Sequence, residues 1–293
     1  MVQKKDKLMM VEDVYPELRL YSNRVGLFNT HFQNFKQFGI PKAQLLIADV
    51  PYNIGKNAYG SNPMWYVNGD NKNGESDLAG KEFFDTDKDF RPAEFMHFCS
   101  QMLRPEPKEK GKAPAMVLFC NYDQQFMYIE LAKRYGLVNY IPLVFRKNYS
   151  PQVLKSNMRI VGNCEYGLVF YRHYLPKFNN HGRMVYNCID YPRELGMRRT
   201  HSTQKPISLL KMFIDLFTDV DDVVIDPTAG SGSTIVAAAS MGRKAYGFEI
   251  KKDFYRLACE NIKRYIEPDM FDVPANVRHQ QKMQQIKQTQ LFE

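Results

Sequence analysis

Two acids stand directly after apolar runs that are typical of buried strands, and both are followed by residues that suit a ligand site. In "LLIADVPY", Asp49 ends such a run and is followed at once by Pro51 and Tyr52. In "VVIDPTAGSGST", Asp226 has the same position and precedes a glycine-rich turn. If both runs are strands of one parallel sheet, their acids lie at the same edge, where open α/β sheets bind ligands.

The glycine-rich turn is compatible with several kinds of site. Gly230 and Gly232 allow the backbone to approach a ligand closely, although such turns also serve simple strand–helix packing. A phosphate-binding P-loop needs a Gly-Lys-Ser/Thr ending that is absent, and a dinucleotide site needs a third glycine where Ile235 stands. The remaining interpretation is the S-adenosylmethionine (SAM) pocket of a methyltransferase, in which Asp226 holds the amino-acid part of the cofactor. Glu249, at the end of the next strand, "KAYGFE", then accepts the ribose hydroxyls.

The segment from Asp49 to Tyr52 suits an aromatic amine as the methyl acceptor. The lone pair of such an amine is delocalised into the ring, and hydrogen bonds that favour tetrahedral geometry make it more nucleophilic. Asp49 and the carbonyl of Val50 accept the two amine hydrogens, Tyr52 stacks on the base, and Pro51 stiffens the turn so that the acceptors are positioned in advance. The amine then attacks the sulfonium methyl in line, and no covalent enzyme intermediate is required.

The elements that position these residues alternate between strands and helices, which predicts an α/β protein with a mostly parallel sheet. The expected strands are 43–52, 115–121, 139–147, 165–173, 221–227 and 244–250. The expected helices are 93–103, 124–136, 207–218, 233–242 and 252–266. Residues 1–40 carry no clear pattern, 56–92 is a long polar loop, 174–200 is irregular and basic, and 267–293 is a polar tail.

The order of "ADVPY", "HSTQKP" and "IDPTAGSGST" resembles the β group of DNA amino-methyltransferases, over roughly residues 40–265. The segment "FRKNYSPQVLKSNMRIVGNCEYGLVFYRH" is similar to the one that carries Trp-x-Lys, Arg and His-Glu in that family. The resemblance implies a Rossmann-like fold with a mostly parallel seven-stranded sheet, helices on both faces and a circularly permuted motif order. It also implies a catalytic domain over residues 1–266, with an inserted loop and a short recognition segment at 174–200.

Site residues follow from the resemblance by matching motifs. The target amine is bound by Asp49, Val50, Pro51 and Tyr52. SAM is bound by Asp226, Pro227, Thr228, Gly230, Gly232, Glu249, Thr203, Gln204 and Lys205. The resemblance implies that Lys205 binds the SAM carboxylate; without the surrounding motif, Lys205 would be interpreted as a surface lysine at the start of a helix.

Three departures from the family pattern bear on the activity. Val50 stands where the family usually has proline, so the carbonyl survives but the turn loses rigidity. Thr228 replaces a phenylalanine near the cofactor, and "RLYSNRVGLF" lacks the Gly-Asp that often lies near the cofactor adenine. The acid at Asp49 is typical of adenine methylation, whereas serine is typical of cytosine methylation.

The resulting hypothesis is SAM-dependent methylation of the 6-amino group of adenine in DNA, with the base extruded from the duplex. The alternatives are a cytosine 4-amino methyltransferase and a non-catalytic DNA-binding homologue or subunit of the same fold. A methyltransferase that acts on RNA or on a protein amine is a further alternative.

Composition agrees with a nucleic-acid partner. The 293 residues carry a formal net charge of +8, which suits a polyanion, with DNA before an anionic membrane surface. The expected DNA contacts are basic residues, each of which is alternatively a solvated surface charge: Lys147, Lys155, Arg159, Arg198 and Arg199.

The sequence gives no sign of a metal site, a signal peptide or a membrane span. The five cysteines form no C-x-x-C pair and the six histidines have no metal-ligand spacing. We therefore expect a cytoplasmic protein with reduced thiols and no metal. The family resemblance implies a bacterial or bacteriophage origin.

Further partners are suggested by two segments. The recognition segment is short, which favours a short target, a homodimer or a partner methyltransferase subunit. Gln288, Leu291 and Phe292 in "QTQLFE" match the short Gln-x-x-Leu-Phe peptides that dock on the bacterial replication sliding clamp. The alternative for this tail is a disordered end.

Overall fold

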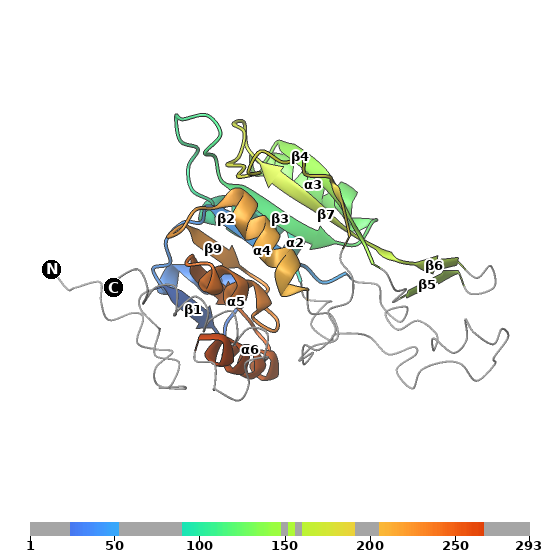
Figure 1. Ribbon diagram of the computed structural model, residues 1–293. Helices are drawn as coiled ribbons and strands as arrows, with labels where there is room; N and C mark the ends of the chain where they lie inside the picture. The colour runs from blue at the N-terminus through green and yellow to red at the C-terminus, as the bar shows by residue number, and fades with distance from the viewer. Residues whose placement is uncertain (1–23, 53–89, 148–151, 156–159, 191–204, 267–293) are drawn as a thin grey trace, which may run out of the picture.

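The computed structural model describes residues 24–52, 90–147, 152–155, 160–190 and 205–266. Within them an eight-stranded sheet has the order β1-β10-β9-β2-β3-β7-β4-β8, and a separate hairpin pairs β5 with β6 (Figure 1). The main strands are β1 (Val25–Phe28), β2 (Leu45–Asp49), β3 (Ala115–Cys120), β4 (Asn139–Arg146), β7 (Cys164–Tyr171), β8 (Cys188–Asp190), β9 (Val223–Asp226) and β10 (Lys244–Phe248). The hairpin strands are β5 (Gln152–Lys155) and β6 (Ile160–Gly162).

The sheet is mostly parallel, as expected, and only β7 runs against its neighbours β3 and β4. The expected strand count of seven is wrong for the described residues, because β8 adds an eighth strand beside β4. This strand lies in the segment 174–200, for which the sequence predicts irregular structure. Its side chains are largely exposed, so it has no apolar pattern, and its strand geometry comes from backbone pairing with β4.

Helices cover both faces of the sheet, which confirms the predicted α/β layering (Figure 1). One face packs on α4 (Ile207–Phe217), α5 (Ser233–Ser240) and α6 (Lys252–Ile266). The other packs on α2 (Pro92–Met102), α3 (Gln124–Arg134) and the short helix η3 (Phe32–Gln37). Alternate residues of β2 enter the two cores, with Leu45 and Ile47 on the α4 side and Leu46 and Ala48 on the α2 side.

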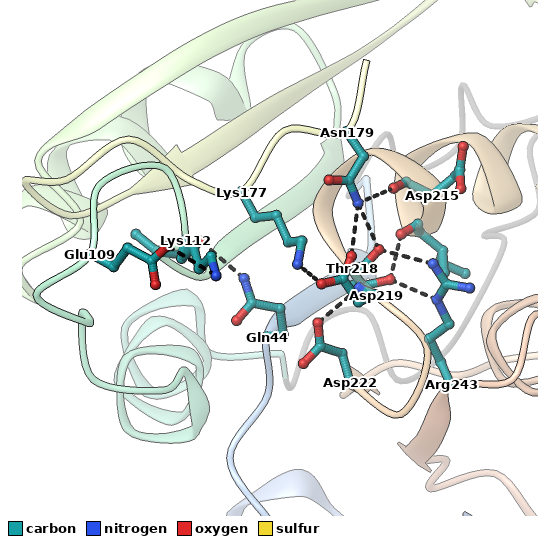
Figure 2. Close-up of polar contacts among 12 residues, drawn as sticks. Gln44, Glu109, Lys112, Lys177, Asn179, Asp215, Thr218, Asp219, Asp222 and Arg243 are labelled. Atoms are coloured by element: carbon teal, nitrogen blue, oxygen red, sulfur yellow. Dashed lines mark hydrogen bonds and ion pairs between the residues drawn. The ribbon is translucent and has the colours of Figure 1, made fainter. Parts of the chain in front are cut away.

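The C-terminal end of α4 is held by side chains from two other segments, as Figure 2 shows. Asn179 Nδ2 donates to the carbonyls of Asp215 and Thr218 at 3.2 and 3.1 Å. Arg243, only 8% exposed, donates to the Thr218 carbonyl and to its hydroxyl, both at 2.9 Å. Lys177 adds an ion pair with Asp219. These contacts satisfy carbonyls that the helix itself leaves without a donor, and they fix α4 against the sheet.

Candidate active site

Three acids lie at one edge of the sheet, at the carboxyl ends of adjacent parallel strands. Asp49 ends β2, Asp226 ends β9, and Glu249 follows β10. The strand β9 lies between β2 and β10 and pairs with both in parallel. The charge of Asp49 is near enough to contribute to the raised pKa of Asp226. The two acid-tipped strand ends, far apart in sequence, therefore meet as the sequence predicted.

The glycine-rich turn after β9 is tied to these acids through its backbone. Glu249 accepts the N–H of Gly230 at 2.9 Å, and Asp226 accepts the N–H of Thr228 at the same distance. Gly230 and Gly232 have φ values of 51° and 77°, which favour glycine. A Cβ on Gly232 would also lie 3.0 Å from the Cβ of Ala258 in α6, so the turn passes too close to that helix for a side chain.

Burial changes the protonation of both acids at this turn. It raises the pKa of Asp226 to about 7, and hydrogen bonds from Thr234 and Thr228 oppose the rise. It also raises the pKa of Glu249, against the hydrogen bonds from the backbone N–H groups of Lys251 and Gly230. Two carboxyl groups that are costly to ionise therefore stand side by side, an arrangement typical of sites for polar or cationic ligands.

The Asp-Val-Pro-Tyr turn is fixed to the neighbouring strand by hydrogen bonds. The N–H of Val50 donates to the carbonyl of Phe119 at 3.2 Å. Gln124, at the start of α3, donates from Nε2 to the Pro51 carbonyl at 2.8 Å and accepts the Asn121 N–H at 3.0 Å. A proline at position 50 has no N–H to donate. The expected loss of rigidity at Val50 is thus countered by a backbone bond that the family's usual residue cannot form.

One oxygen of Asp49 is occupied and the other is not. Lys205 Nζ, just before α4, donates to Asp49 Oδ2 at 2.8 Å and to the Tyr52 hydroxyl at 3.1 Å. Asp49 Oδ1 is buried and accepts no hydrogen bond from any residue that the structure describes. A buried carboxylate oxygen without a donor is costly. This oxygen is therefore available to a hydrogen-bond donor supplied by a ligand.

Lys205 belongs to a buried group of charges that sequence reasoning did not assemble. Its Nζ lies 3.3 Å from Glu165 Oε2 at the start of β7, and Lys147 after β4 forms an ion pair with Glu165 Oε1. The side chain of Lys147, which the sequence predicts as a DNA contact or alternatively as a solvated surface charge, is only 8% exposed. Glu165 stands at the glutamate of the His-Glu pattern in the segment that resembles the family, and Lys147 at the lysine of Trp-x-Lys, but the resemblance assigns no role to either.

Some of the remaining predicted site residues lie in the described part of the chain, and the others lie outside it. Lys155 lies in β5, in the hairpin that connects β4 to β7. The other predicted cofactor, DNA and clamp residues lie outside the described residues: Thr203, Gln204, Arg159, Arg198, Arg199, Gln288, Leu291 and Phe292. Pro227 and Thr228 are in the described turn after β9. The extent of the catalytic domain, residues 1–266, stays a prediction.

Residues 43–260 match the N6_N4_Mtase family model, described as a DNA methylase. The chain belongs to this family of DNA methylases. It is 27% identical over 251 residues to the DNA adenine methyltransferase YhdJ of Escherichia coli K12. This alignment covers 78% of each chain. It is also 40% identical over 62 residues to the type II methyltransferase M.HindIII of Haemophilus influenzae, 21% of this chain and 20% of that protein.

Solved structures show the same methylase fold. The M1.HpyAVI–SAM complex aligns with a TM-score of 0.57 at 18% identity, over 81% of this chain and 99% of that one. The cytosine-N4-specific PvuII DNA methyltransferase aligns with a TM-score of 0.57 at 15% identity, over 86% and 96%. The cofactor of this methylase is SAM, and its substrate is DNA.

The described residues fit SAM at the turn after β9. Buried acids at the ends of β9 and β10 flank a turn in which Gly230 and Gly232 present backbone without side chains. A Cβ on Gly230 would meet only the Thr228 carbonyl at 3.9 Å, so the space beside that backbone is open. Among the described residues, no group of three or more His, Cys, Asp or Glu side chains is placed to hold a metal ion. The described helices are all too short or too polar to cross a membrane.

Proposed function

We propose that this DNA methylase transfers a methyl group to the 6-amino group of adenine. The observation that carries the proposal is the unpaired Oδ1 of Asp49, buried at the same sheet edge as the turn that fits SAM. An exocyclic amine has two hydrogens to donate, and a buried acceptor without a donor is the complementary group. The opposite oxygen is held by Lys205, which fixes the orientation of the carboxylate.

Each residue of the turn has a separate task in this mechanism. Asp49 Oδ1 accepts one amine hydrogen and the Val50 carbonyl accepts the other, so that the nitrogen lone pair is drawn out of conjugation. Tyr52 stacks on the base. The bond from the Val50 N–H to the Phe119 carbonyl and the bond from Gln124 to the Pro51 carbonyl hold the turn in place before the base arrives. Asp49, which already accepts one amine hydrogen, is then in place to take the proton that the amine loses after it is methylated.

The methyl donor is held by the second set of residues. SAM supplies the methyl group on a sulfonium, and the acids and backbone groups at the end of β9 and β10 suit its polar parts. Asp226 and the turn at Gly230 and Gly232 bind its amino-acid part, and Glu249 binds its ribose. Thr203 and Gln204 are proposed to complete this site.

Adenine is favoured over cytosine by the acid at position 49 and by the relative YhdJ, whose name gives adenine as its target. The PvuII enzyme, which shares only the fold, is cytosine-specific, so the competing product is N4-methylcytosine. Either base must leave the duplex to bring its amine to a buried acceptor, and base extrusion is therefore part of the proposal. Lys155, Arg159, Arg198 and Arg199 are the proposed contacts to the DNA backbone.

The test is methyl transfer from labelled SAM to genomic DNA, followed by digestion to nucleosides and separation of N6-methyladenine from N4-methylcytosine. The wild type should label adenine, and Asp49→Asn should lose at least about a hundredfold in rate while it still binds SAM. Equal amounts of RNA and of protein serve as competing acceptors. Label in cytosine, in RNA or in protein, or full activity of Asp49→Asn, would refute the proposal.

A further inference from the structure

We infer that Glu165 and Lys147 are positioning residues for Asp49 and act on it through Lys205. The inference rests on the proposed role of Asp49. Four side chains alternate in charge along one connected line: Asp49, Lys205, Glu165 and Lys147. Lys205 Nζ lies 2.8 Å from Asp49 Oδ2 and 3.3 Å from Glu165 Oε2, and Lys147 pairs with the second oxygen of Glu165.

These four residues come from separate parts of the chain and meet in a largely buried place. Asp49 ends β2, Lys205 precedes α4, Glu165 opens β7 and Lys147 follows β4. The side chains of Lys147, Lys205 and Glu165 are 8%, 9% and 18% exposed. Buried ion pairs are expensive to desolvate and add little net stability. Asp49 itself is 30% exposed, so the three more deeply buried charges, Lys205, Glu165 and Lys147, lie directly behind the proposed acceptor, which points to a functional role.

Glu165 determines where the ammonium group of Lys205 lies. One carboxylate oxygen of Glu165 faces Lys205 and the other faces Lys147, so Glu165 cannot turn away from Lys205 without losing both pairs. The rings of Tyr52 and Phe119 lie 5.2 and 5.1 Å from Lys205 Nζ and limit it further. With its position fixed in this way, Lys205 binds Oδ2 of Asp49 and leaves Oδ1 for the amine.

The same line of charges sets how basic Asp49 is. Burial raises the pKa of Asp49, Lys205 lowers it, and Glu165 raises it again. A hydrogen bond from the Tyr52 hydroxyl also lowers the pKa of Asp49, and Cys120 of β3 and Asp226 of β9 interact electrostatically with it. Lys205 thus helps to keep the carboxylate ionised, and Glu165 offsets part of this effect, which makes the carboxylate a stronger acceptor for the amine hydrogens. Lys147 limits this effect by pairing with Glu165.

This arrangement gives Lys205 a different task from the one its motif suggests. The resemblance places Lys205 at the SAM carboxylate, whereas its described partners are on the side of the methyl acceptor. If Lys205 positions Asp49, Lys205→Met should reduce methyl transfer at neutral pH. The midpoint of the fall in activity at low pH should also move to a higher pH. If it serves the cofactor, the same variant should raise the Kd for SAM and leave that midpoint in place.

The decisive experiment measures single-turnover methyl transfer to DNA against pH, at saturating SAM and DNA. Activity falls at low pH as Asp49 becomes protonated. Glu165→Gln removes a negative charge, so the midpoint of that fall should move down by about half a unit or more; Lys147→Met removes a positive charge and should move it up by about as much. A purely structural role for these residues lowers activity without opposite shifts.

Two further variants keep the test decisive. Lys147→Arg retains the charge and should keep the wild-type midpoint, even if Lys147→Met does not fold. Asp190→Asn breaks the exposed pair with Arg146, whose Nε lies 2.6 Å from Asp190, and should leave the midpoint unchanged. Unmoved midpoints in both Glu165→Gln and Lys147→Met, with Asp49→Asn inactive, overturn this inference alone. Full activity of Asp49→Asn overturns the proposed function instead.

Discussion

The buried carboxyl group of Asp226, which is proposed to bind SAM, lowers the stability of the folded protein. Asp226 is 4% exposed, and burial raises its pKa from 3.8 to about 7. The folded protein therefore holds a proton on Asp226 at pH values where the unfolded chain has released it. Stability is lost as the pH rises from the lower pKa to the higher one, because ionisation of the buried acid becomes a cost that unfolding relieves.

Asp226→Asn should remove this cost. Asn keeps an oxygen that can accept the Thr228 N–H, but it does not ionise. The free energy of unfolding of the variant, minus that of the wild type, should increase by about 2 kcal/mol from about pH 5.5 to about pH 8.5. Urea unfolding at the two pH values measures this increase, and SAM binding should weaken in the same variant. An identical difference at both pH values would contradict the assignment.

Gln124 illustrates how one element positions another. It joins the start of α3 to the Pro51 carbonyl, next to the residues that are proposed to receive the amine. Gln124→Ala should slow single-turnover methyl transfer about tenfold, because a looser turn presents its acceptors less often in the productive geometry. The Kd for SAM should not change. Gln125→Ala is the matched control, since its side chain bonds to none of the described residues, and an equal loss there would remove the special role of Gln124.

The second contact between elements joins Arg243 to the C-terminal end of α4. We expect this contact to affect the stability of the fold more than methyl transfer. Arg243 donates to the Thr218 carbonyl and hydroxyl and to the Met241 carbonyl from a buried position. Arg243→Met should lower the free energy of unfolding by about 2 to 4 kcal/mol because these acceptors lose their donor. Arg243→Lys, which keeps the charge without the planar fork, should lose less. Thermal or urea unfolding provides the measurement, and equal losses would contradict the hydrogen-bonding role.

At the scale of the whole molecule, the tail is predicted to recruit a partner. Residues 288–292 carry the pattern Gln-x-x-Leu-Phe, with Leu291 and Phe292 as apolar anchors. Binding of the full chain to an immobilised bacterial sliding clamp should weaken at least about tenfold in Leu291→Ala and Phe292→Ala. Thr289→Ala, inside the same pattern but not an anchor, is the control. Equal binding by all of these variants would show that the pattern has no such role.

Much of the fold can be predicted from local patterns in the sequence. The apolar runs that end at Asp49 and Asp226 are strands, the glycine turn leads into α5, and the helices begin and end close to the predicted residues. Because β2 and β9 are parallel neighbours, their acids must meet at one edge. The sequence thus determined the α/β class, the position of the turn that is proposed to bind the amine, and the side of the sheet that carries this turn, since periodicity and strand direction are local properties.

Only the tertiary structure decided which charges face one another. Lys147, Glu165 and Lys205 are separated along the chain, and their meeting depends on the reversed direction of β7 and on its register against β3 and β4. A change of register by one residue would turn Glu165 to the opposite face of the sheet. The bond from the Val50 N–H to Phe119 and the edge strand β8 likewise depend on backbone groups that every residue except proline carries, so side-chain patterns could not reveal them.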